Sequence, residues 1–127
     1  MRGLGEVAER LRRSAARVFT GGHGGGSGIV WSADGLILTN AHVVRDRAAE
    51  VELWDSRRFP ATVTARDPRR DLATLKISAD ALDPAQPGDS ATLRAGEIVM
   101  AIGSPLGFAG ALSTGVVHST TPRTRHT

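Results

Sequence analysis

Cysteine and tyrosine are both absent from this 127-residue chain, which has only two tryptophans and three phenylalanines. Without cysteine the chain forms no disulfide and no thiolate metal site, although this excludes neither a reducing nor an oxidising compartment. The scarcity of aromatic rings leaves no stacking platform for nucleic-acid bases. The net charge of +3 comes almost entirely from scattered arginines. Nucleic-acid binding is therefore the weakest of the three functions considered for this chain.

Long apolar runs are missing as well. Residues 1–19 contain no run of signal-peptide length, and no stretch of the chain is long and apolar enough to span a membrane. The sequence as written thus indicates a cytoplasmic protein. A signal missing from its start would place the protein in the periplasm or the cell envelope instead.

Motifs for metals and cofactors are also lacking. The histidines are His23, His42, His118 and His126, and no two of them stand at the close spacing of a metal-ligand pair. The glycine-rich segment at residues 21–26 lacks the Gly-Lys-Ser/Thr ending of a phosphate-binding loop, so we interpret it as a flexible connection between two strands. We expect neither a metal nor a cofactor.

Apolar residues at Leu4, Val7 and Leu11 recur at helical spacing among arginines. Over residues 1–14 this spacing predicts a short amphipathic helix. We expect the helix to pack on the domain that follows it. An arginine-rich targeting or membrane-surface segment is the alternative, and the acidic residues within the helix count against a transit peptide.

The rest of the chain alternates short apolar segments with turns. Residues 28–31 and 36–39 are predicted to form two strands joined by the tight turn Ser-Ala-Asp-Gly, and His42 follows the second strand. Asp71 comes 29 positions later, after a segment long enough for a further hairpin. It opens the next strand, beside the end that carries His42.

A histidine and an aspartate brought together in this way are two of the three parts needed for hydrolysis by a serine. The serine hydroxyl becomes nucleophilic beside a neutral imidazole, whose second nitrogen is held in the right tautomer by a carboxylate. Taken singly, a histidine or an aspartate in such a setting is more often a structural residue. Their surroundings therefore decide the interpretation.

Ordered motifs surround both residues. They are Gly-Ser-Gly-Ile-Val at 26–30, Leu-Thr-Asn-Ala-His-Val-Val at 38–44, Asp-Leu-Ala-Thr-Leu-Lys-Ile at 71–77, and the strand-like segments at 93–107 and 113–117. In this order they resemble the trypsin-like serine proteases of the HtrA/Deg type. The resemblance covers about residues 15–119.

The resemblance implies an all-β fold with a trypsin-like six-stranded antiparallel barrel, the first of that family's two barrels, and a short N-terminal helix. It divides the chain into the helix at 1–14, the first barrel at 15–107, the first strand region of a truncated second barrel at 108–119, and a disordered tail at 120–127. By the same resemblance His42 is the catalytic general base and Asp71 is its orienting carboxylate.

No nucleophile completes this pair. The family carries its serine in a Gly-x-Ser-Gly-Gly loop of the second barrel, and the chain has no such segment. The Gly-Asp-Ser at 88–90 is followed by alanine and threonine rather than two glycines, so we interpret Ser90 as a loop residue. Ser27 and Ser104, each beside a glycine, are predicted to be turn or strand residues.

The leading interpretation is a fragment of a serine endopeptidase that acts on polypeptides and is inactive alone, from a truncated or frameshifted gene. A complementing chain or a homo-oligomer would supply or cover the missing half. The second interpretation is a non-catalytic polypeptide-binding module, which captures extended chains through an exposed barrel face and open sheet edges. Substrate preference is not readable, because the pocket-forming segments of the family are absent.

Overall fold

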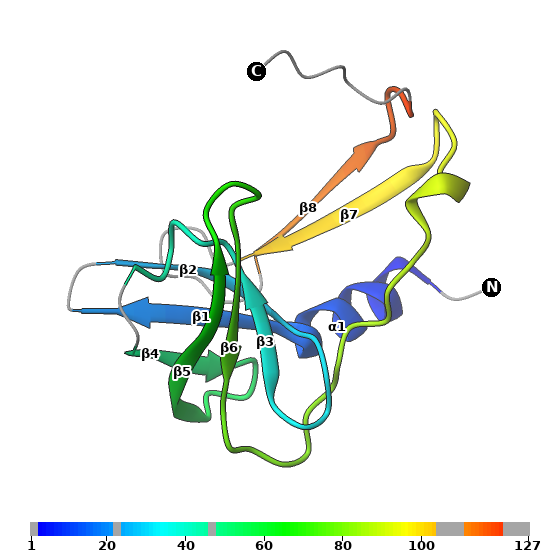
Figure 1. The fold of residues 1–127 in the computed structure, drawn as a ribbon. Helices are drawn as coiled ribbons and strands as arrows, with labels where there is room; N and C mark the ends of the chain where they lie inside the picture. Colours follow the sequence, from blue (N-terminus) through cyan, green and yellow to red (C-terminus); the bar gives the residue numbers. More distant parts are fainter. Residues whose placement is uncertain (1–2, 22–23, 46–47, 104–110, 121–127) are drawn as a thin grey trace.

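Six strands close into an antiparallel barrel in the computed structural model, which describes residues 3–21, 24–45, 48–103 and 111–120 (Figure 1). The strands are β1 (Ala15–Thr20), β2 (Gly24–Val30), β3 (Leu36–Thr39), β4 (Ala48–Leu53), β5 (Arg58–Asp67) and β6 (Leu72–Lys76). Their order around the barrel is β1-β2-β3-β6-β5-β4, and β4 pairs back with β1. The all-β class and the six-stranded barrel predicted from the sequence are confirmed.

The core forms because alternate residues of each strand point into the barrel. In β3 and β6 this alternation buries Ile37, Ala73 and Leu75, while Leu72 and Lys76 face outward. The largest fully buried side chains are Ile37, Leu75, Ile77, Val18, Val30, Val44 and Val51. Branched aliphatic residues thus fill the small barrel almost alone, which agrees with the low aromatic content of the sequence.

The helix α1 (Leu4–Ser14) packs on the barrel, as the sequence predicts. The Arg13 guanidinium lies 4.9 Å from the centre of the Trp54 ring, and the Ser14 hydroxyl donates to the carbonyl of Asp83 at 2.8 Å. Leu11 lines an apolar cavity of about 300 Å³ together with residues of β2 and β3. Across the described ranges, none of the helices is long and apolar enough to cross a membrane.

A second, two-stranded sheet follows the barrel. A single 3-10 turn, η1 (Ser90–Thr92), leads to β7 (Ile98–Gly103), which pairs with β8 (Ala111–Val116). One end of this ribbon lies against the barrel and the other projects away from it (Figure 1). The predicted first-barrel range 15–107 includes β7, whereas the closed barrel ends with β6. Most of the predicted tail, residues 121–127, lies outside the described residues.

One prediction about the glycine-rich segment is wrong. Its second half is not a connection but the start of β2, because Gly24 and Gly26 pair with Thr20 and Val18 of β1. Because glycine has a low strand propensity, this strand was predicted to begin only at residue 28. These glycines allow a close approach, since a Cβ at Gly25 would lie 2.7 Å from the Val18 carbonyl oxygen. Residues 22 and 23 lie outside the described part of the chain.

Candidate active site at one end of the barrel

The pairing of β3 with β6 brings together two segments that are far apart in sequence. Thr39, the last residue of β3, lies opposite Ala73 near the start of β6. His42 follows the end of β3, and Asp71 immediately precedes β6. Because the strands are antiparallel, both residues emerge at the same end of the barrel.

His42 sits on a tight turn that is anchored on both sides. The Val43 N–H donates to the Asn40 carbonyl at 3.1 Å, and the Val44 N–H donates to the Ala41 carbonyl at 3.3 Å. Ala41 and Val44 are buried, with 1% and 0% of their surface exposed. The two buried anchors fix the turn, and the exposed His42 lies between them.

Asp71 ends the four-residue turn that joins β5 to β6. Its N–H donates to the Pro68 carbonyl at 3.3 Å, and the Arg70 N–H donates to the Asp67 carboxylate at 3.2 Å. The φ angle of Asp71 is +55°, in the left-handed region that few non-glycine residues adopt. Aspartate and asparagine tolerate this region better than most residues, so this residue type suits the turn as well as the site.

Both oxygens of the Asp71 carboxylate accept hydrogen bonds from His42. Oδ2 lies 2.7 Å from the ring nitrogen Nδ1, and Oδ1 accepts from the backbone N–H at 2.9 Å. The backbone N–H of His42, and after it the His42 ring, lowers the pKa of the Asp71 carboxyl below its usual 3.8. The carboxylate therefore stays ionised and fixes both the backbone and the ring of His42.

Three further side chains brace the two turns, and sequence reasoning identified none of them. Asn40 donates from Nδ2 to the Asp71 carbonyl at 2.9 Å. Arg66, on β5, donates to the Ala41 carbonyl at 2.9 Å, and Thr20, on β1, donates to the Val43 carbonyl at 3.4 Å. Asn40 could have been noticed because it belongs to the Thr-Asn-Ala-His motif. The roles of Arg66 and Thr20 depend on which strands lie side by side, and this arrangement leaves no local signal in the sequence.

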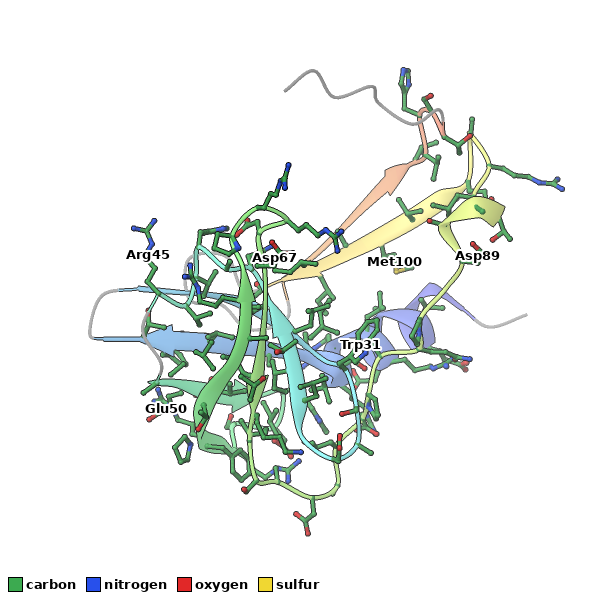
Figure 2. The ribbon with its side chains drawn as sticks, in the orientation of Figure 1. Trp31, Arg45, Glu50, Asp67, Asp89 and Met100 are labelled. Atoms are coloured by element: carbon green, nitrogen blue, oxygen red, sulfur yellow. The ribbon has the colours of Figure 1, made fainter. Side chains whose placement is uncertain are left out.

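The histidine and aspartate pair is open to solvent. The side chains of His42 and Asp71 are 64% and 44% exposed. Beside His42 lies a shallow cavity of about 390 Å³, lined by Thr20, Gly21, Gly24, Gly25, Val43 and Arg45. Figure 2 labels Arg45 and Asp67, which mark the loop after β3 and the start of the β5–β6 turn. Nothing in the described residues covers the pair, so water reaches it freely.

No serine among the described residues forms a hydrogen bond with His42, in line with the expectation that the chain lacks a nucleophile beside it. Asp71 is the only hydrogen-bond partner of His42 among the described residues. Ser90 begins the turn η1, where the Asp89 carboxylate accepts from the Ala91 N–H at 2.9 Å, and it is an exposed loop residue as predicted. Ser27 lies within β2, and Ser104 falls outside the described residues.

The geometry allows one chemical role for the ring. A carboxylate can only accept, so the short contact to Oδ2 requires the proton of neutral His42 to be on Nδ1. The lone pair is then on Nε2, which has no hydrogen-bond partner in the described parts of the chain. An imidazole in this tautomer, backed by an ionised carboxylate, can accept a proton from a hydroxyl placed next to Nε2.

Comparison with known proteins shows which family the chain belongs to. The family model for the trypsin-like peptidase domain matches residues 26–127. The chain belongs to the trypsin-like peptidase domain family. Within it, the chain is 48% identical over 98 residues to the mitochondrial serine protease HTRA2 of Drosophila virilis, and 47% identical to that of Drosophila erecta. The match covers 75% of this chain and 23% of each relative.

This trypsin-like peptidase domain is also similar to solved structures of HtrA-type proteases. The HtrA-type protease AlgW, in a structure with a tripeptide, superposes with a TM-score of 0.87 at 30% sequence identity. The superposition covers 93% of this chain and 40% of that one. The chain thus spans less than half of the solved relative and about a quarter of the curated ones.

Proposed function

We propose that this chain contributes the general base and its orienting carboxylate to a serine endopeptidase, with His42 as the base and Asp71 as the carboxylate. The observation that carries the proposal is the contact of 2.7 Å between His42 Nδ1 and Asp71 Oδ2, with the second carboxylate oxygen on the His42 backbone. Membership of the trypsin-like peptidase domain family supports it. The resemblance to HtrA-type proteases makes polypeptides the expected substrate.

In this proposal the proton moves through Nε2 of His42. The ring takes the proton of a serine hydroxyl as the oxygen attacks the peptide carbonyl, and Asp71 stabilises the imidazolium that forms. The same proton then passes to the departing amine, which returns the ring to its neutral tautomer. Asp71 remains ionised throughout and keeps Nδ1 protonated.

The serine itself has to come from residues that this sequence does not contain, since its 127 residues hold no Gly-x-Ser-Gly-Gly segment. The same residues would cover the exposed pair and exclude water, which strengthens the electrostatic interactions inside the site. Loss of the serine alone lowers turnover in another serine protease by roughly a million-fold. We therefore expect no measurable peptide hydrolysis by the 127 residues alone.

A complementation experiment tests the proposal. The chain is produced alone and together with a polypeptide that carries the Gly-x-Ser-Gly-Gly barrel of an HtrA-type relative, and both samples are treated with a fluorophosphonate probe. We expect labelling only in the complemented sample and loss of labelling in its His42→Gln variant. In the complemented pair, Asp71→Asn should slow peptide hydrolysis by about ten-thousand-fold, because the ring then takes the wrong tautomer.

Two results would contradict the proposal. One is labelling of the chain alone, which would mean that it carries its own nucleophile. The other is a complemented pair that co-purifies and yet reacts equally well with and without the His42 imidazole.

A second candidate function is the capture of extended polypeptide without cleavage. It is favoured by the β7–β8 sheet, whose outer edges pair with no other strand in the described residues. Open edges accept an added strand through backbone hydrogen bonds. Binding of an extended peptide by the chain alone, with a β7 or β8 N–H protected from hydrogen exchange, would support this function.

A further inference from the structure

We propose that Gly26 is a positioning residue for His42: the absence of a side chain at 26 leaves room for Val43, the residue that follows His42 in its turn. Only the catalytic role of Gly26 in this inference rests on the proposed function. Its structural content, which is that Gly26 controls the contact between His42 and Asp71, is independent of any activity.

The packing at Gly26 is closer than a side chain would permit. A Cβ built on Gly26 would lie 2.6 Å from Val43 Cγ2, 3.1 Å from Cγ1 and 3.5 Å from Cβ. Ordinary van der Waals contact begins at 3.4 Å, so both methyl groups of Val43 occupy space that even an alanine would need. The three nearest atoms all belong to Val43, which makes this single residue responsible for the restriction.

Backbone conformation does not explain the glycine. Gly26 lies in β2 and pairs in register with Val18 of β1. The glycines with positive φ in the described residues are Gly21, Gly35 and Gly96, so Gly26 has a backbone that any residue could adopt. In a strand interior glycine is normally unfavourable relative to alanine. The sequence keeps a locally unfavourable residue here, and the space taken by Val43 accounts for it.

Val43 cannot easily move aside. Its carbonyl accepts from the Thr20 hydroxyl at 3.4 Å, and its N–H donates to the Asn40 carbonyl at 3.1 Å. Its side chain packs against the buried core, and a β-branched residue has few alternative rotamers. Strands β1 and β2 therefore hold Val43 from two sides. Thr20 of β1 binds the Val43 carbonyl, and Gly26 of β2 packs against the Val43 methyl groups.

A displacement of Val43 would reach His42 directly. The two residues share one tight turn, and His42 contacts Asp71 through both its backbone N–H and its ring. Hydrogen bonds weaken steeply once they lengthen or bend beyond the usual range. Pushing Val43 away from β2 by several tenths of an ångström would thus disturb the contact of 2.7 Å between Nδ1 and Oδ2.

The test measures the tautomer of His42 in the chain alone by nitrogen-15 NMR, with the signal assigned through a His42→Gln variant. In the native chain we expect the Nδ1–H form. Gly26→Ala should lose this preference, and the double variant Gly26→Ala with Val43→Ala should regain it, because the nearest atom to the added Cβ is then Val43 Cβ at 3.5 Å, an ordinary contact. Val43→Ala alone should keep the native tautomer.

The matched control is Gly115→Ala in β8, a strand glycine whose added Cβ would have its nearest neighbour at 4.0 Å. This variant should leave the His42 tautomer unchanged. If Gly26→Ala does not fold, a folded double variant with the native tautomer still supports the proposal. A folded Gly26→Ala chain with an unchanged tautomer overturns it, and so does failure of Val43→Ala to restore the native state. Neither failure would affect the assignment of His42 as a base.

Discussion

Asp71 combines a demanding backbone conformation with a charged side chain that holds His42. Its φ of +55° favours glycine, asparagine or aspartate, and its two oxygens hold the backbone and the ring of His42. An alanine substitution would therefore strain the turn and remove the carboxylate at the same time. Asparagine keeps the backbone preference but removes the charge and replaces one of the two accepting oxygens by a donor, so it tests the carboxylate separately from the backbone.

We expect Asp71→Asn to unfold at a higher urea concentration than Asp71→Ala at neutral pH, because asparagine tolerates the left-handed backbone and alanine does not. Equilibrium denaturation followed by circular dichroism measures the difference. The Leu72→Ala variant, at the exposed first residue of β6, serves as a control for the removal of a neighbouring side chain. Equal midpoints for the two Asp71 variants would show that the backbone conformation contributes nothing.

The pH dependence of stability follows from the lowered pKa of Asp71. A carboxyl whose folded-state pKa lies below its unfolded value of 3.8 stabilises the native state above that value, and this contribution is lost as the pH falls through the lower folded-state pKa. Asp34 should act in the same direction, because the Ser32 hydroxyl and then Lys76 lower its pKa.

We therefore expect the native chain to lose stability as the pH falls below 3.8, and Asp71→Asn to show a shallower loss. Urea denaturation at a series of acidic pH values tests this. The slope that remains in the variant should decrease again when Asp34→Asn is added. An unchanged acid slope in Asp71→Asn would mean that the carboxyl has the same pKa in both states.

At the residue scale, the sequence indicated which two residues meet at the candidate site, but not which residues hold them in place. His42 and Asp71 could be identified because both lie in ordered motifs, and the structure places them in contact. The roles of Gly26 and Arg66 could not be predicted, although Gly26 lies in the motif at 26–30, because these residues contact Val43 and Ala41 only after the strands have paired. Packing partners depend on which strands pair in the folded chain, whereas a motif can be recognised along the sequence.

At the element scale, the hairpin between β2 and β3 shows how a short turn sets the geometry of a strand pair. Gly35 has a φ of +106°, its N–H donates to the Ser32 carbonyl at 3.2 Å, and its carbonyl accepts from the Ile77 N–H at 3.0 Å. A Cβ at this position would overlap the Ile77 carbonyl oxygen. Glycine is thus required here both by the backbone and by the approach of the segment after β6.

We expect Gly35→Ala to lower the free energy of unfolding by more than about 2 kcal/mol, because the strained backbone and the overlap add together. Gly96→Ala is the comparison: its φ is +92°, but an added Cβ would meet nothing within 4 Å. It should lower stability by no more than about 2 kcal/mol. Similar losses in the two variants, measured by urea denaturation, would show that the contact with Ile77 is unimportant.

Strand positions were largely predictable because short apolar segments are bounded by turn residues, and β3 was placed at 36–39 as observed. The start of β2 was missed because its first three residues are glycines, which have a low strand propensity although they pair with β1 here. The shift in register between Val63 and Ala65 of β5 was not predicted either, since a bulge depends on the partner strand. Apolar segments bounded by turns show which residues form a strand, but they do not show where the pairing is irregular.

At the scale of the whole molecule, apolar surface is unevenly distributed. The barrel buries its aliphatic residues, whereas Ile98 and Val116, which pair across β7 and β8, are 69% and 62% exposed. Val99 and Leu93 add to the apolar surface of this region. Contiguous exposed apolar surface favours association with another chain.

We expect the double variant Ile98→Thr with Val116→Thr to reduce concentration-dependent association while leaving the thermal unfolding of the barrel unchanged. Threonine retains the branched shape that suits a strand, and it replaces the ethyl group of Ile98 and one methyl group of Val116 by a hydroxyl. Light scattering measures association. The control is Ile37→Val in the core, which should lower stability by about 1 kcal/mol without changing association. Unchanged scattering in the β7–β8 variant would show that this face is not responsible.

The order of the strands also has a consequence for folding. β3 and β6 are neighbours in the barrel, but the whole of β4 and β5 lies between them in the chain. Bringing them together requires the entropy of a long loop to be lost before the new contacts compensate for it. His42 and Asp71 meet only when that step is complete, so in a refolding experiment their hydrogen bond should appear together with barrel closure, later than the local hairpins.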